Sequence, residues 1–271
     1  MNQKTESILL RALTLLAAAM TVGTLLFLII YILIRGIPYL KPSLFAWEYN
    51  TENVSLMPAM INTIVMTVLS LLIAIPMGVG SAIYLVEYAK RGSKFVELIR
   101  LTTETLSGIP SIIYGYLLFV IQLHFGYSIL GGALTISIMI LPLIMRQTEE
   151  SLKAVPDLFR EGSLGLGAGK LRTIFSIVLP SAVPGILAGI ILAIGRIVGE
   201  TAALIYTAGT VAGIPNSIMG SGRTLAIHMY VLTNEGLYTN QSYATAVVLL
   251  LVVTMINALS SMLAKKLASK A

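Results

Sequence analysis

Apolar residues gather along this chain into six long stretches, which are separated by shorter polar segments. A helix needs about 20 residues to cross the hydrocarbon core of a bilayer, and most of the stretches approach or exceed that length. The pattern therefore predicts an all-α integral membrane protein with six transmembrane helices. Their approximate limits are Leu13–Leu33, Ile61–Leu85, Leu106–Leu123, Ile129–Met145, Val183–Ala208 and Ala244–Leu263. The third and fourth stretches are short, and the FGYS turn at residues 125–128 predicts that they form a close helical hairpin.

Composition supports a membrane protein and excludes several classes of site. Hydrophobic residues make up 56% of the chain and charged residues only 11%, more apolar surface than a soluble domain of this length could bury. Cysteine is absent, which excludes disulfides, a thiolate nucleophile and a cysteine metal site. The two histidines, His124 and His228, have no carboxylate at ligand spacing, so we expect no zinc site. No hydrolase or metalloprotease motif occurs, and we expect no enzymatic activity.

The distribution of basic residues predicts the orientation. The net charge is +6, but the basic residues form short clusters at the ends of the apolar stretches, which favours membrane lipid over nucleic acid as their partner. Three basic residues, Arg35, Lys41 and Arg223, lie on one side of the predicted membrane, and Arg196 lies inside the fifth stretch. The other fourteen lie on the opposite side: Lys4, Arg11, Lys90, Arg91, Lys94, Arg100, Arg146, Lys153, Arg160, Lys170, Arg172, Lys265, Lys266 and Lys270. Cytoplasmic loops are enriched in lysine and arginine, so both termini are predicted to be cytoplasmic.

The segment between the fourth and fifth stretches contains one ordered motif, EGSLGLGAGKLRTIFSIVLP, at residues 161–180. A glutamate is followed by two small residues, then by a glycine at a fixed distance, and the motif ends in two apolar residues one position apart and a proline. Its members are Glu161, Gly162, Ser163, Gly167, Ile177, Leu179 and Pro180. This layout resembles the "EAA" loop of ABC importer permeases.

In that family the loop is a cytoplasmic helix-turn-helix that docks onto an ATPase subunit, and the resemblance implies the same role for residues 147–180, called the coupling loop below. The residue types suit this role. Small side chains at Gly162 and Ser163 allow a partner to approach the backbone, Gly167 can take the positive φ of a tight turn, and Pro180 suits the first turn of a helix. The family has alanines where Gly162 and Ser163 stand, and the glycine weakens the helix by roughly 1 kcal/mol.

The resemblance extends over about four fifths of the chain. From about Met57 onward, the sequence is similar to the five-helix core of type I (MetI-like) importer permeases. It implies two regions: residues 1–56 with an added N-terminal transmembrane helix and an external loop, and residues 57–271 with the permease core. The run GLGAGK at Gly165–Lys170 is not a phosphate loop, because GxxxxGK[ST] does not fit at residues 164 and 171. We expect no cofactor in this chain, and ATP and Mg are expected on partner ATPases.

A narrower resemblance lies in the fifth stretch, where GRIVGETAAL at Gly195–Leu204 is similar to permeases of phosphate importers of the PstA type. Arg196 and Glu200 are four residues apart, so we expect them to share a helix face and to pair. Charges within a membrane are mostly functional, and a guanidinium matches phosphate oxygens, so the pair is a candidate anion site. The alternative is an ion pair that only locks helix packing.

Three hydroxyl residues complete the expected substrate path: Thr201 beside Glu200, and Ser107 and Ser111 on either side of Pro110. Pro110 removes a helix hydrogen bond and frees backbone groups near the two serines. These groups either line a polar path or mark a kink in the helix, and the kink is the simpler interpretation.

Together the motifs predict one permease subunit of an ATP-driven phosphate importer in the prokaryotic inner membrane. The implied partners are a second permease (PstC type), two ATPase subunits (PstB type) and an external phosphate-binding protein (PstS type). One alternative is a permease for another oxyanion, such as sulfate or molybdate. The other is an ATP-independent secondary transporter or channel, in which Arg196 and Glu200 would form an ion relay.

Overall fold

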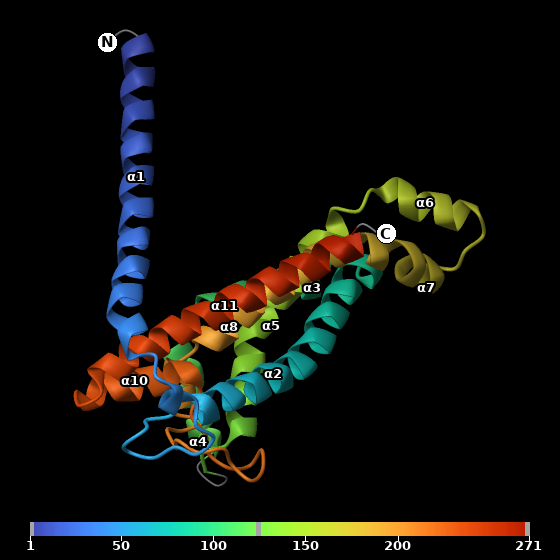
Figure 1. Cartoon of the computed structure of the whole chain (residues 1–271). Coiled ribbons are helices and arrows are strands. Elements are labelled where there is room, and N and C mark those ends of the chain that lie inside the picture. Colours follow the sequence, from blue (N-terminus) through green and yellow to red (C-terminus); the bar gives the residue numbers. More distant parts are fainter. Residues whose placement is uncertain (1–2, 91, 123–125, 269–271) are drawn as a thin grey trace.

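The computed structural model describes residues 3–90, 92–122 and 126–268, and these form helices joined by loops (Figure 1). The elements are α1 (Gln3–Gly36), η1 (Ile37–Tyr39), η2 (Pro42–Phe45), α2 (Met57–Ile83), η3 (Tyr84–Tyr88), α3 (Lys94–Gly108), α4 (Ser111–Gln122), α5 (Ile129–Lys153), α6 (Asp157–Gly165), α7 (Lys170–Thr173), η4 (Ile174–Val178), α8 (Leu179–Gly199), α9 (Ala202–Ile205), α10 (Leu225–Glu235) and α11 (Thr239–Ala268). Of the short elements, η1 and η2 are 3-10 helices, whereas η3 and η4 are π-helical turns.

Within the described residues, five helices are long and apolar enough to cross a membrane. They are Ser7–Tyr39, Met57–Tyr88, Ile129–Lys153, Lys170–Gly199 and Thr239–Met262. Four of the six predicted stretches, the first, second, fourth and sixth, fall in one of these helices and are confirmed as helical. Four positions used in the sequence analysis, Arg91, Leu123, His124 and Lys270, lie outside the described residues, as does Phe125, the first residue of the predicted FGYS turn.

The third predicted stretch, Leu106–Leu123, is not one continuous helix. Helix α3 ends at Gly108 and α4 begins at Ser111, with Ile109 in an extended conformation between them (φ −71°, ψ 130°). Pro110 causes the break, because a proline lacks an N–H and keeps the preceding residue out of the helical region. The chain therefore contains a shorter apolar helix, Ser111–Val120, where a full span was predicted.

The fifth predicted stretch, Val183–Ala208, is also interrupted. The long helix begins before this stretch and ends at Gly199, and Glu200 has an extended backbone (φ −71°, ψ 130°). A separate short helix, α9, follows. The Glu200 carboxylate accepts a hydrogen bond from the Ala203 amide (3.1 Å), so this side chain satisfies the start of α9 and does not continue the face of α8.

Helix α5 forms the centre of the bundle. Its apolar window is 67% buried, against 28% for α2 and for the helix that contains α8. Ile136, Ile140 and Ile144 recur every four residues on α5 and are fully or almost fully buried. The α2–α5 contact is close: a Cβ on Gly78 would lie 2.8 Å from Ile144 Cγ2. Serine hydroxyls also cross between the two helices, as Ser70 Oγ donates to Ala133 O at 3.2 Å.

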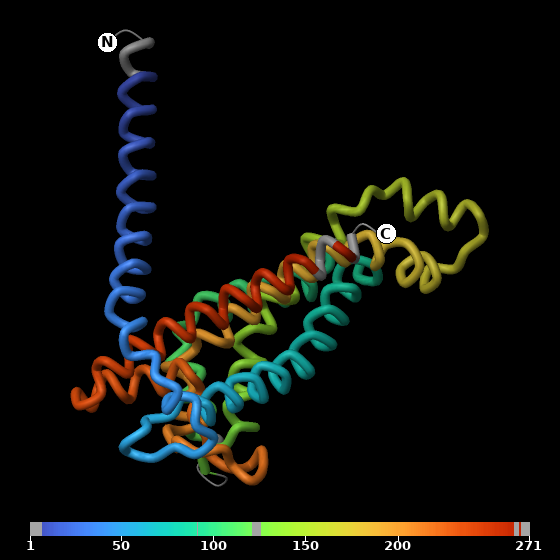
Figure 2. Tube along the Cα trace, in the orientation of Figure 1, coloured from blue at the N-terminus to red at the C-terminus, as the bar shows by residue number. Residues whose placement is uncertain are grey.

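Helix α1 stands apart from this bundle (Figures 1 and 2). Its apolar window is 0% buried, and it meets α11 only near its C-terminal end, where Gly36 lies against Tyr243 and Val247. The rings of Tyr31 and Tyr243 make an edge contact at 5.9 Å. Most of the apolar surface of α1 is therefore free to contact lipid or another subunit.

At the end of the bundle opposite the coupling loop, a buried cluster fastens the segment between α9 and α10. Arg223 is buried, and its guanidinium lies 4.8 Å from the ring centroid of Tyr49. The same ring makes an edge contact with His228, which is completely buried. Burial, followed by the positive charge of Arg223, lowers the pKa of His228 from 6.5 to about 3. His228 is therefore neutral at physiological pH.

Gly115→Ala should destabilise the fold, because a Cβ at this position of α4 would lie 2.6 Å from Ala203 O and 2.7 Å from Ala203 Cα. The clash is with backbone, so α4 and α9 must separate, and overpacking of this kind costs roughly 1–3 kcal/mol. We expect a lower thermal unfolding temperature for the detergent-solubilised protein. The control is Gly80→Ala in α2, where a Cβ would meet open space; equal losses in the two variants would contradict the assigned contact.

Stability should fall as the pH drops from about 6.5 toward 3, because the unfolded state binds a proton at His228 in this range and the folded state does not. The loss should be visible between about pH 7 and pH 5, where few other side chains titrate. His228→Leu should flatten the pH dependence of the unfolding temperature over this interval.

Candidate functional site

The coupling loop is a helix-turn-helix that projects from one end of the bundle, close to the end of α11 (Figure 1). Helices α6 and α7 form its two arms, and Gly167 lies in the turn with φ +82°. The predicted helix-turn-helix and the predicted positive φ at Gly167 are both confirmed. The arms are joined by a buried hydrogen bond between the hydroxyls of Ser163 and Thr173 (2.9 Å). Ser163 therefore holds the turn together and is not itself exposed.

The loop exposes an unusual amount of apolar surface. Leu166, at the turn, is 92% exposed, and Leu158 in α6 and Leu171 in α7 are 72% and 66% exposed. Phe159, Leu164 and Phe175 are also exposed. Apolar side chains clustered on a projecting element are typical of a surface that another protein covers. Glu161 and Gly162 are exposed on the same element, so a partner could reach them.

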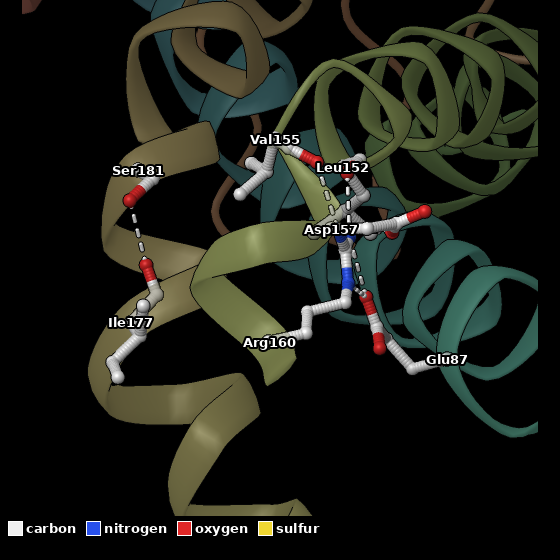
Figure 3. Close-up of polar contacts among 7 residues, drawn as sticks. All are labelled: Glu87, Leu152, Val155, Asp157, Arg160, Ile177 and Ser181. Carbon is white, nitrogen blue, oxygen red and sulfur yellow. Dashed lines mark hydrogen bonds and ion pairs between the residues drawn. The ribbon is translucent and has the colours of Figure 1, made fainter. Parts of the chain in front are cut away.

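The remaining predicted coupling residues lie at the base of the loop. Ile177 is half-buried, and its carbonyl accepts a hydrogen bond from Ser181 Oγ (2.7 Å; Figure 3). Leu179 and Pro180 are half-buried in the first turn of α8, as the prediction for Pro180 required. The motif therefore has two parts: Glu161–Gly167 forms the projecting part, whereas Ile177–Pro180 joins it to the bundle.

Arg160, directly before Glu161, is a functional candidate that the sequence analysis missed. Its Nη2 and Nε lie 2.9 and 3.1 Å from Glu87 Oε1 (Figure 3). Nη1 donates to Val155 O (2.7 Å) and Nη2 to Leu152 O (2.8 Å), and Nη1 also pairs with Asp157 (3.2 Å). Glu87 is 73 positions away in sequence, so spacing gave no signal. The one indication in the sequence was Glu87 itself, a lone carboxylate just after the second apolar stretch.

A second feature is a polar cleft of about 540 Å³ between α3, α5 and the end of α8. Arg196 and Ser107, two of the predicted substrate-path residues, both line it. Its charged lining residues are four cations, Arg100, Arg146, Lys153 and Arg196, and three carboxylates, Glu104, Glu149 and Glu150. The structure thus brings Arg196 and Ser107 together, whereas Ser111, Glu200 and Thr201 do not line this cleft.

Ion pairs occupy most of the cations in the cleft, but not Arg196. Glu149 is bound by both Arg100 and Lys153, each at 2.6 Å, and Arg146 pairs with Glu150 at 3.1 Å. Arg196 forms no ion pair with any residue that the structure describes. Since its side chain is half-buried, the guanidinium has unused donors that face a polar space.

The predicted pairing of Arg196 with Glu200 is wrong. The spacing of four residues places side chains on one face only while the helix continues, and α8 ends at Gly199. The buried Glu200 carboxylate turns instead to the Ala203 amide. Thr201 makes only a long contact with Gly199 O (3.4 Å), and Ser107 Oγ donates to Glu104 O (2.7 Å). Among the described residues, no group of three or more histidines and carboxylates could hold a metal ion.

Known proteins resemble this chain in both sequence and fold. It is 34% identical over 260 residues to the probable ABC transporter permease protein YqgI of Bacillus subtilis, covering 88% of this chain and 86% of that protein. It is 35% identical over 211 residues to the phosphate transport system permease protein PstA 1 of Mycobacterium tuberculosis, covering 76% of this chain and 69% of that protein. PstA of Pasteurella multocida is also 35% identical, covering 76% and 75%.

Two solved structures share the fold at low sequence identity. An inward-facing MetNI methionine ABC transporter superposes with a TM-score of 0.63 and 18% identity, covering 78% of this chain and 94% of that one. A bacterial alginate ABC transporter gives 0.65 and 16%, covering 93% and 95%. A family model described as "Binding-protein-dependent transport system inner membrane component" matches residues 74–270. The chain therefore belongs to this family, as a multi-pass permease subunit of an ABC transporter that is not itself an enzyme.

Proposed function

We propose that this chain is a permease subunit of an ATP-driven phosphate importer. The observation that carries the proposal is the projecting helix-turn-helix of the coupling loop, which has exposed leucines on both arms and Gly167 in its turn. A projecting element with exposed apolar side chains suits docking onto a partner ATPase. Phosphate as the substrate is supported by the relatives named PstA and by the free guanidinium of Arg196.

The coupling loop would act by moving as a unit. Partner ATPases bind ATP and Mg, close on the nucleotide, and displace the helix-turn-helix that is docked on them. The Ser163–Thr173 hydrogen bond keeps the two arms together during this motion. The base of the loop continues directly into α8, so a displacement at the turn reaches the transmembrane bundle. Such switching is a rigid-body change between two packed arrangements.

Arg196 would hold the anion by its unused donors. A planar guanidinium can bind two phosphate oxygens at once, and charge-assisted hydrogen bonds of this kind are stronger than neutral ones. The nearby carboxylates of Glu149 and Glu150 keep the other cations occupied, which limits the affinity and favours release. Ser107 lines the α3 side of the same cleft, where its hydroxyl oxygen can accept a hydrogen bond. Glu200, Thr201 and Ser111 would shape the path through the two helix breaks.

The proposed assembly contains a second permease, two ATPases and an external binding protein. The unburied apolar surface of α1 and the open cleft beside Arg196 suit contacts with lipid and with a second permease. The charge bias supports cytoplasmic termini. It also agrees with the layout, in which the coupling loop and the end of α11 lie together, away from η2 and α10 (Figure 1). In this assembly, residues 1–56 add a helix and an external segment to the core.

The complete complex in membrane vesicles loaded with ATP should take up phosphate, and a Glu161→Gln/Gly167→Val variant should lose this uptake. Valine at a positive φ is strained by roughly 1–2 kcal/mol, which opens the turn. Gly162→Ala is the matched control, because its Cβ would meet open space and alanine favours the helix. Phosphate uptake that needs no ATP would contradict the proposal of an ATP-driven importer. ATP-dependent uptake of sulfate or molybdate in the same vesicles, without ATP-dependent uptake of phosphate, would transfer the function to another oxyanion.

Arg196→Gln should reduce phosphate uptake by about tenfold or more, since hydrogen bonds to charged groups contribute about 1.5–3 kcal/mol. Arg146→Gln is the matched control, because Arg146 lines the same cleft but is exposed and already paired with Glu150. Initial uptake rates over a range of phosphate concentrations would separate a higher KM from a lower maximal rate. Equal effects of the two substitutions would argue against a specific anion contact at Arg196.

A further inference from the structure

Two charged side chains, one from each arm, reach from the coupling loop to the end of α2. From α6, Arg160 reaches Glu87, and from α7, Lys170 lies with its Nζ 4.8 Å from the ring centroid of Tyr88. Glu87 and Tyr88 are neighbours in η3, the π-helical turn that ends α2. The loop continues covalently into α5 and α8 but lies far from η3 in sequence, so only side chains connect α2 to it. Besides the two contacts above, these include a buried apolar cluster in which Ala82 and Leu85 lie with Leu152, Val155 and Val178.

The Arg160–Glu87 ion pair is the stronger part of this contact. The side chains of Arg160 and Glu87 are 16% and 8% exposed, so both charges are largely removed from water. Each nitrogen of the guanidinium has an acceptor: Glu87 for Nε and Nη2, Val155 O for Nη1, and Leu152 O for Nη2 as well. A buried pair that is this fully hydrogen-bonded fixes the relative positions of its elements, and removing one partner leaves the other charge unpaired.

Arg160 joins three elements that would have to move together: α6, the end of α5 and the end of α2. Leu152 O lies in the last turn of α5, and Val155 O lies two residues beyond the end of this helix at Lys153, so Arg160 also caps the C-terminal end of the central helix of the bundle. Glu87 belongs to the end of α2, which packs along α5. One side chain of α6 is thus bound to both helices at the end facing the loop (Figure 3).

We infer that the Arg160–Glu87 pair is the link through which the coupling loop moves α2 together with α5, with Arg160 as a positioning residue. The inference rests on the proposed function. Without the pair, the loop still docks and still follows its covalent connections, but the end of α2 is held to it only by apolar packing and the Lys170–Tyr88 contact and follows it less closely. The expected defect is uncoupling: ATP is hydrolysed and less phosphate is carried per ATP.

The test compares purified complexes in vesicles, and the measured quantity is phosphate transported per ATP hydrolysed. Glu87→Gln removes the charge pair but keeps Arg160 on the two carbonyls at the C-terminal end of α5. We expect this ratio to fall at least about fivefold, since coupling free energies between sites correspond to factors of roughly 5–150. The rate of ATP hydrolysis should remain close to that of the wild type. The control is Asp157→Asn, which removes the other carboxylate on the same arginine; Asp157 is 70% exposed, and the ratio should not change.

A second variant separates coupling from folding. Glu87→Gln/Arg160→Gln leaves no unpaired buried charge, so the complex should assemble. Both substitutions break the same contact, so the double variant should transport no less phosphate per ATP than the more impaired of the two single variants, Glu87→Gln and Arg160→Gln. If Glu87→Gln reduces only the amount of assembled complex, and the surviving complex transports as much phosphate per ATP as the wild type, the pair is structural and the inference is wrong.

A substrate-independent measurement distinguishes failure of the inference from failure of the proposed function. The chain has no cysteine, so spin labels can be placed at Asp157→Cys in α6 and Tyr84→Cys in η3, both exposed. In the wild-type complex the distance between the labels should stay the same with and without ATP. In Glu87→Gln it should change on ATP binding. If the distance is unchanged in both the wild-type and the Glu87→Gln complex, the Arg160–Glu87 pair is not the link between the loop and α2, even if transport is ATP-driven. A constant distance in the wild type that changes in Glu87→Gln would support it even if phosphate is not the cargo.

Discussion

Backbone polar groups in lipid must find partners within the protein, and this constraint governs the whole structure. Long helices satisfy it for most of α1, α2, α5, α8 and α11, although Pro76, Pro142 and Pro184 each remove one backbone donor inside α2, α5 and α8. The two places where a helix breaks, at Ile109–Pro110 and at Glu200–Thr201, need other donors and acceptors. Tyr114 Oη donates to Leu106 O (2.7 Å) at the first break, and the Glu200 carboxylate accepts from the Ala203 amide at the second. Each break is therefore satisfied by a side chain close to it in sequence.

The short helices that follow the two breaks, α4 and α9, pack against each other. Gly115 on α4 lies so close to the Ala203 backbone of α9 that there is no room for a Cβ. Irregular backbone at membrane depth is tolerated where protein covers it, and here α4 and α9 pack together beside the two breaks. Tyr206 adds edge contacts with Tyr116 and Phe119, so aromatic rings close the same region. The arrangement places Arg196, one turn before the second break, at the edge of the polar cleft.

The sequence predicts those parts of the structure that depend on local chemistry. Four apolar stretches were recognised as helices because lipid demands a long apolar helix, and Gly167 was assigned its positive φ because an ordered motif placed a glycine in a turn. Hydropathy alone does not detect the end of α8, since Gly199 and Thr201 are compatible with an apolar stretch. The expected Arg196–Glu200 pair failed for that reason. The Arg160–Glu87 contact could not be predicted, because it depends on how distant segments pack.

Two arginines of the chain occupy opposite electrostatic situations, and the difference follows from their surroundings. Arg160 has carboxylate and carbonyl acceptors within 3.2 Å for every guanidinium nitrogen, so exchanging its partners would cost several strong hydrogen bonds at once. Arg196 has no ion pair among the described residues and faces a polar cleft, so it can gain a partner without losing one. Under the proposed function, passing the motion of the coupling loop to the bundle requires a fully hydrogen-bonded arginine such as Arg160. Transient binding of an anion requires an arginine with unused donors, such as Arg196. A permease that placed the free arginine in the coupling loop would lose the stiffness of the link, and one that saturated Arg196 would have no donor left for its substrate.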